Sequence, residues 1–99
     1  MKASAWSRGG GTFGIRVGIP NRNAHFDPGW SEIQVEIDGQ IHRFAITKGF
    51  WNKCPEFRDS GSTVIQDWLQ QHFTLDWPSG QPPRFQLVPL GDAKFRLIG

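Results

Sequence analysis

A two-residue turn signal, Asp38-Gly39, is the feature of this 99-residue chain that most constrains its fold. It joins two segments of alternating apolar and polar residues that together span 31–47, SEIQVEIDGQIHRFAIT. Both turn positions tolerate positive φ, so an antiparallel hairpin is expected. Its register pairs Ile33 with Phe44 and Val35 with His42 on one face. That face requires a covering layer, because an isolated hairpin is marginally stable in water.

The segment 62–73, STVIQDWLQQHF, is predicted to supply that layer as an amphipathic helix. At 100° per residue its larger side chains gather on one half of the helical wheel and its polar residues on the other. The apolar half holds Val64, Ile65, Trp68, Leu69, His72 and Phe73. Ser62 or Thr63 is expected to cap the first turn, and Thr63 has capping-box spacing to Gln66.

Three further strands are expected, one before and two after these elements. The segment 12–19, TFGIRVGI, alternates as a strand with one buried face. A second hairpin turns at Gly91-Asp92 and sets Phe85 and Leu87 against Phe95 and Leu97.

The predicted fold class is therefore α+β in two layers. A single helix packs on a five-stranded, mostly antiparallel sheet of order β-ββ-α-ββ, either β-grasp-like or curled into a half-barrel. The Gly-rich residues 1–11 are expected to form a flexible leader, and 12–99 a single domain.

Composition favours a soluble cytoplasmic protein. The single cysteine cannot form an internal disulfide, and no apolar run approaches the length that spans a membrane. The net charge of +2 is unevenly spread, because residues 1–26 carry four basic residues and no acid. This leaves nucleic-acid binding as one interpretation, in which loop aromatics stack on bases and cations contact phosphates. The candidate cations are Arg8, Arg16, Arg22, Lys94 and Arg96.

No arrangement of residues points to an enzyme. No paired carboxylates, nucleophile–base order or metal-ligand spacing is present, so no catalytic residue, cofactor or metal ligand is predicted. A second alternative is a small-ligand or enzyme pocket between helix and sheet. Its candidate residues are His42 and His72, on the two predicted apolar faces, and Cys54 from the loop above them.

The loop 48–59, KGFWNKCPEFRD, favours a third interpretation, which is placed first. Its aromatic residues fit neither a helical nor a strand period, and Phe50 and Trp51 must point to opposite sides of an extended backbone. Phe57 is expected to turn into the core, and Trp51 to be buried only by a partner. The chain is thus predicted to be a non-catalytic interaction module that self-associates, first as a dimer. The interface candidates are Phe50, Trp51, Lys53, Trp77 and Trp30.

Overall fold

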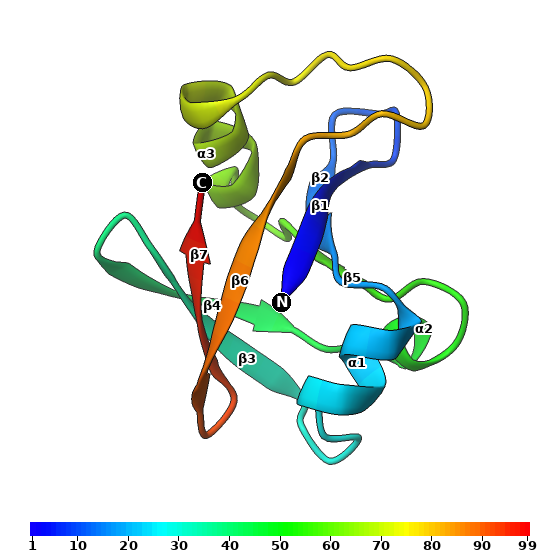
Figure 1. Cartoon of the computed structure of the whole chain (residues 1–99), viewed down its shortest axis with the longest axis vertical. Helices are drawn as coiled ribbons and strands as arrows, with labels where there is room; N and C mark the ends of the chain where they lie inside the picture. Colours follow the sequence, from blue (N-terminus) through cyan, green and yellow to red (C-terminus); the bar gives the residue numbers. More distant parts are fainter.

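The computed structural model describes residues 1–99, which form one seven-stranded sheet and three short helices (Figure 1). In chain order the elements are β1 (Lys2–Ser7), β2 (Phe13–Arg16), α1 (Ile19–His25), β3 (Glu32–Ile37), β4 (Gln40–Ala45), α2 (Lys48–Trp51), β5 (Glu56–Arg58), α3 (Val64–His72), β6 (Arg84–Gly91) and β7 (Lys94–Ile98). Helix α3 lies at the opposite end of the molecule from α1 and α2 (Figure 1). No helix combines the length and the apolar character that crossing a membrane requires.

The strands follow the order β4-β3-β7-β6-β1-β2-β5. All neighbours are antiparallel except β3 and β7, which are parallel. The sheet curls until its two edge strands approach each other, and the rings of Phe44 on β4 and Phe57 on β5 have centroids 5.2 Å apart. No backbone ladder joins these two strands. The sheet is therefore barrel-like and nearly closed.

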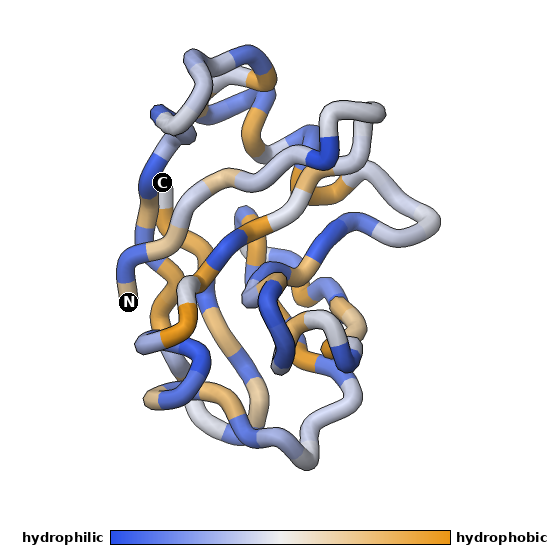
Figure 2. The backbone as a smooth tube through the Cα atoms, turned by 90° about the vertical axis from the view of Figure 1, so that its right-hand side faces the viewer, coloured by the Kyte–Doolittle hydropathy of each residue, from blue (hydrophilic) through white to orange (hydrophobic).

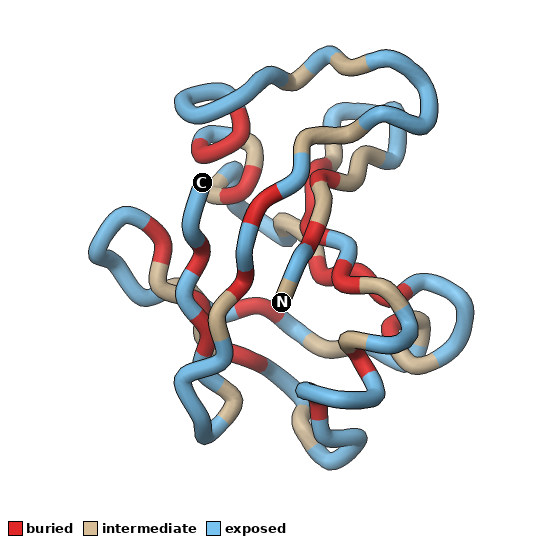
Figure 3. Tube along the Cα trace, viewed as in Figure 1, coloured by how far each residue is buried: buried red, intermediate tan, exposed pale blue.

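The interior of this sheet is filled by a single cluster of buried apolar side chains. Because successive residues of a strand point to opposite faces, every second side chain enters the core. Figure 2 shows hydrophobic and hydrophilic residues alternating along the chain, and Figure 3 shows buried positions spaced along the strands while most of the loops are exposed. The core takes up the inward positions, so the outer face and the loops remain for binding.

The central hairpin and the amphipathic helix are confirmed. Asp38 and Gly39 form the turn with φ of 50° and 83°, and Ile33 lies opposite Phe44 as predicted. Helix α3 falls inside 62–73 and buries Ile65, Trp68 and Leu69, whereas His72 and Phe73 of the predicted apolar half are exposed. The second hairpin is confirmed as β6 and β7, although the residues with positive φ extend from Gly91 through Asp92 to Ala93.

The predicted fold class is wrong. The sheet has seven strands rather than five, it curls almost into a barrel, and three helices rather than one accompany it. One of the missed strands is β1, formed by residues 2–7 of the expected flexible leader. Its inward side chains are Ala3 and Ala5, whose small apolar surface gives a weak periodic signal. The other missed strand, β5, has only three residues.

The two additional helices lie in segments for which no helix was predicted. The predicted strand 12–19 ends at Arg16, and α1 begins at Ile19 with Pro20 in its first turn. Proline suits that position, because the amide that it lacks has no partner within the helix. Helix α2 is a single turn that takes up residues 48–51 of the aromatic loop.

The start of α3 is capped by Asp59 rather than by Ser62 or Thr63. The Asp59 carboxylate accepts hydrogen bonds from the amides of Ile65 at 2.8 Å and Gln66 at 3.0 Å. Burial raises the pKa of Asp59 above its ordinary value of 3.8, and nearby Asp67 raises it further. The two amide hydrogen bonds lower the pKa and offset part of this rise.

These contacts predict a pH-dependent effect of Asp59→Asn. Because the pKa is raised by folding, the protonated carboxyl favours the folded state. This contribution is complete below about pH 3.8, and it is lost as the pH rises through the raised folded-state pKa. Asparagine has one side-chain oxygen instead of two, so it cannot accept a hydrogen bond from each amide on a separate oxygen. The substitution should therefore cost about 1 kcal/mol of unfolding free energy.

Urea unfolding of wild type and Asp59→Asn at about pH 3 and about pH 7 checks this prediction. The cost of the substitution should be larger at the lower pH. A cost that grows with pH would show that the amide hydrogen bonds outweigh desolvation at this carboxyl.

Candidate anion-binding groove on the outer face

Three neighbouring strands place basic side chains in one row across the outer face of the sheet. Ser4 at the middle of β1 lies opposite Arg16 of β2 on one side and Arg84 of β6 on the other. Ala3 and Ala5 point into the core, so Lys2, Ser4 and Trp6 must point outward. The outward side of β1 therefore carries a cation, a hydroxyl and an indole in succession.

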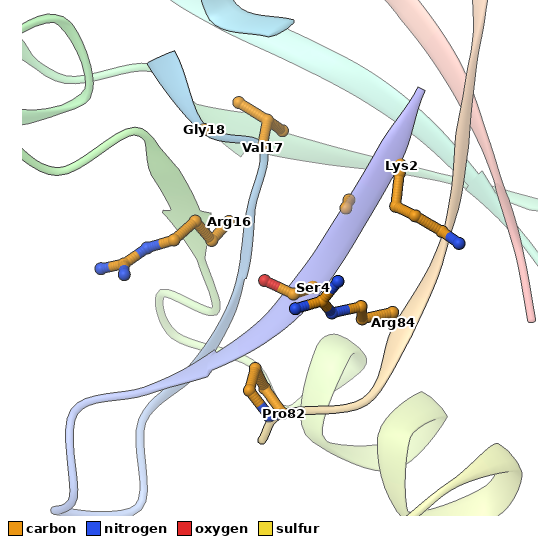
Figure 4. Close-up of a pocket in the computed structure, with 8 residues that line it drawn as sticks. Lys2, Ser4, Arg16, Val17, Gly18, Pro82 and Arg84 are labelled. Atoms are coloured by element: carbon orange, nitrogen blue, oxygen red, sulfur yellow. The ribbon is translucent and has the colours of Figure 1, made fainter. Parts of the chain in front are cut away.

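A hollow of about 240 Å³ lies over this row. Lys2, Arg16 and Arg84 line it together with Ser4, and no carboxylate does. In Figure 4 the Arg84 side chain lies across β1 beside Ser4, while the Arg16 side chain extends from β2 away from β1. Two arginines and a lysine, of which only Arg16 has a carboxylate within 4 Å, make a site that favours an anion.

A second hollow of about 520 Å³ continues from the first and shares Arg16, Pro82 and Arg84 with it. Its walls add the indoles of Trp6 and Trp77 and one acid, Asp76. The two hollows are together called the groove. It places cations at one end and flat aromatic surfaces at the other.

The Trp6 side chain is held from one side by an arginine that reaches it across β2. Trp6 lies opposite Gly14, which in turn lies opposite Arg58 of β5. The Arg58 guanidinium carbon is 4.8 Å from the centroid of the Trp6 ring, a cation–π contact. Gly14 has no side chain to separate them, and a Cβ there would lie 3.0 Å from Trp6 Cε3.

Trp77 belongs to the long loop between α3 and β6 and packs edge-on against Phe13, with ring centroids 6.2 Å apart. The loop is shaped next to it by a local turn, in which the Thr74 hydroxyl accepts the Asp76 amide and donates to the Asp76 carbonyl, both at 3.0 Å. Trp77 is half-buried, so part of its ring faces the groove.

A buried carboxylate lies behind the groove. Glu56 precedes the core residue Phe57 on β5, so its side chain belongs to the outer side of the sheet, yet only 1% of it is exposed. Glu56 Oε2 lies 3.6 Å from Arg16 Nη2, and Oε1 lies 3.8 Å from Arg58 Nη2. Both distances exceed that of a hydrogen bond, and Oε2 has no hydrogen-bond partner at all.

The cations predicted for nucleic-acid binding do not form one patch. Arg16 lines the groove, whereas Arg8 lines a separate hollow of about 450 Å³ between the ends of β4 and β5. Lys94 and Arg96 lie on β7, and in the strand order β6 and β1 separate this strand from β2. Arg96 is paired with Glu36.

The prediction for Arg22 is wrong, because this side chain is buried. Its Nη1 donates to the carbonyls of Phe50 at 3.1 Å and Asn52 at 3.2 Å, which ties α1 to α2. Its guanidinium carbon lies 5.1 Å from the Trp51 ring centroid. Arg22 is therefore a structural residue and is not available to phosphate.

The aromatic interface candidates pack largely within the chain. Phe50 and Phe57 are each 1% exposed, so the prediction that Phe57 turns inward is confirmed. Trp51 is half-buried between Phe50 and Arg22, and its Nε1 is buried without a partner. Trp30 packs against Phe26 and Phe95, and Trp77 against Phe13, while Lys53 is exposed. This packing leaves less aromatic surface for a second copy than predicted.

The pocket candidates are not gathered in one place. His42 lines a hollow of about 330 Å³ between the β3–β4 hairpin and α3. His72 is absent from its lining, and its Nε2 lies 3.4 Å from a carboxylate oxygen of Asp38. Cys54 is exposed in the segment between α2 and β5. No three His, Cys, Asp or Glu residues are grouped so that they could hold a metal ion.

Most residues of the groove were not predicted. Lys2, Ser4 and Trp6 were assigned to a flexible leader, and Arg84 was not among the candidate cations. The alternation of KASAWS, with alanine at every second position between polar or aromatic residues, was the available signal. No family model, curated protein or solved structure matches this chain, so the geometry of the groove carries the functional argument.

The contact at Gly14 predicts that Gly14→Ala destabilises the domain and disturbs the Trp6 site. A Cβ at this position would lie 2.5 Å from the Phe57 carbonyl oxygen and 3.1 Å from Arg58 Cα. Both are backbone atoms, and moving them to relieve the clash costs more free energy than moving a flexible side chain. A cost of roughly 1–3 kcal/mol is expected from such overpacking.

Gly10→Ala in the β1–β2 turn is the matched control, because a Cβ there meets nothing within 4 Å. Urea unfolding measures the cost, and near-ultraviolet circular dichroism reports the aromatic environment. Equal stability of the two variants would contradict the close approach of β5 to Gly14.

Proposed function

We propose that this domain binds single-stranded nucleic acid in the groove. The observation that carries the proposal is the composition of the two joined hollows. One is lined by three cations and no acid, and the other adds two indoles and one acid, Asp76, to the shared Arg16 and Arg84. Lys2, Arg16 and Arg84 contact phosphates, and Trp6 and Trp77 offer their rings to bases. The groove thus matches both chemical components of a nucleotide chain.

The cationic end suits phosphate for geometric reasons. Arginine presents a planar fork of donors that matches phosphate oxygens, and the Ser4 hydroxyl beside Arg84 adds a further donor (Figure 4). Electrostatic contacts of this kind supply most of the sequence-independent affinity of nucleic-acid binding proteins. This end of the groove therefore accounts for affinity rather than sequence preference.

The aromatic end favours a single strand over a duplex. Bases are available for stacking on protein rings only where they are unstacked from each other. Stacking on tryptophan tolerates any base, because every base has a π-face. Two indoles in the second hollow thus support binding to unpaired segments with little sequence preference.

Self-association through the aromatic loop has less support than the groove. The rings of Phe50 and Phe57 lie in the core, and Arg22 covers part of Trp51. A partner would therefore meet mainly the exposed Lys53 and the outer part of Trp51 at this loop.

Fluorescence anisotropy with a labelled oligothymidylate of about 12 nucleotides tests the proposal, since single-strand sites of small domains span roughly 4–16 nucleotides. Arg84→Ala should weaken binding and make the slope of log K against log salt shallower by about 0.7, the value of one lost phosphate contact on a single strand. Trp6→Ala should cost about 1–3 kcal/mol while leaving the salt slope unchanged.

Lys94→Ala is the control, because it removes one exposed cation from the outer face but lies on β7, outside the groove. It should bind like wild type. A loss equal to that of Arg84→Ala would indicate diffuse attraction to the basic surface. Absence of oligonucleotide binding by wild type at low salt would refute the function.

A further inference from the structure

The proposed phosphate and base contacts give no role to the buried carboxylate of Glu56, which lies beside the groove residue Arg16. It is 1% exposed, whereas its two neighbours Arg16 and Arg58 are 49% and 33% exposed. A carboxylate removed from water is costly unless it is fully hydrogen-bonded, and neither arginine approaches within hydrogen-bond distance. A contribution to folding stability therefore does not explain why position 56 carries an acid.

The two arginines beside Glu56 are related to the groove in different ways. Arg16 lines both of its hollows. Arg58 lines neither hollow, but it lies over one face of Trp6, which lines the second. Glu56 on β5 is opposite Arg16 on β2, and Arg58 is two residues further along the same strand. One carboxylate thus faces both guanidinium groups.

The resulting chain of contacts runs from Arg16 to Glu56, from Glu56 to Arg58, and from Arg58 to the indole of Trp6. The first link joins β2 to β5, the second lies within β5, and the last crosses β2 at Gly14, which has no side chain to obstruct it. Long cationic side chains at a surface are mobile, and ordering them on ligand binding costs conformational entropy. A carboxylate that attracts both guanidinium groups reduces that cost before the ligand arrives.

We propose that Glu56 is the positioning residue of the groove: it orients Arg16 toward phosphate and, through Arg58, fixes the face that Trp6 presents to a base. The inference rests on the proposed function. It assigns Glu56 no contact with the ligand. The two ends of the groove are then coupled, so that loss of Glu56 impairs base stacking although the indole itself is intact.

Glu56→Gln tests the inference, because it keeps the shape of the side chain and removes its charge. Two probes separate the possible effects: labelled oligothymidylate, which has bases, and inorganic polyphosphate, which has none. If Glu56 positions these side chains, oligothymidylate affinity should fall roughly five- to tenfold, which corresponds to part of the free energy of one stacking contact. Polyphosphate affinity should fall less or stay equal, because the removal of one negative charge from the site offsets the lost orientation of Arg16. A rise for both probes, or an equal fall for both, overturns the inference.

A second readout needs no ligand and therefore separates this inference from the proposed function. Glu56→Gln should alter the near-ultraviolet circular dichroism of wild type, and the change should disappear in a Trp6→Phe background. An unaltered signal would show that Glu56 does not orient Trp6, whatever the protein binds.

Arg58→Lys provides a variant that does not depend on the stability of Glu56→Gln. Lysine keeps the positive charge beside Glu56 but lacks the planar guanidinium that covers the indole. It should reproduce the selective loss of oligothymidylate affinity, and adding Glu56→Gln should then have little further effect on stacking. Wild-type affinity of Arg58→Lys for oligothymidylate contradicts the proposed chain of contacts.

Discussion

The two-sided pairing of β1 holds this domain together. On one side β1 is hydrogen-bonded to β2, which carries β5, and on the other to β6, which leads through β7 and β3 to β4. No other ladder connects these two groups of strands. The Asn21 side chain also fastens α1 to this strand by donating to the Lys2 carbonyl at 3.0 Å. The groove depends on the same pairing, because its cations and the indole of Trp6 come from β1 and from the strands on either side.

The near closure of the sheet depends on small side chains at the inward positions of β1. Ala3 lies opposite Phe85 of β6, and Ala5 lies opposite Ile15 of β2. Small residues beside large ones are a common way to fill the tapered interior of a small barrel. The property that permits the closure also hid the strand from sequence analysis, since alanines give little hydrophobic contrast. Pattern analysis succeeded where side chains are large, in the 31–47 hairpin and in α3, and it failed where packing required small ones.

The candidate site was harder to predict than the fold, for a physical reason. The register that sets Arg16, Ser4 and Arg84 in one row is a relation between strands far apart in the chain, and a single sequence carries no direct signal of it. Arg22 shows the opposite error: a basic residue within a basic segment was predicted to be free, but it donates through Nη1 to the carbonyls of Phe50 and Asn52 and through Nε and Nη2 to Asn23 Oδ1. The capping of α3 by Asp59 was missed because this acid lies several residues before the first helical turn.

The pairing of β1 with β6 joins residues near the two ends of the chain, with Lys2 opposite Gln86 and Ser4 opposite Arg84. Contacts of such large sequence separation form late, because the entropy of closing the long intervening loop must be met first. During synthesis β1 emerges before β6, so it must remain without this partner until β6 has been made. The row of Arg16, Ser4 and Arg84 is therefore assembled only after β6 has paired with β1. An intact row thus reports that the two groups of strands on either side of β1 have joined.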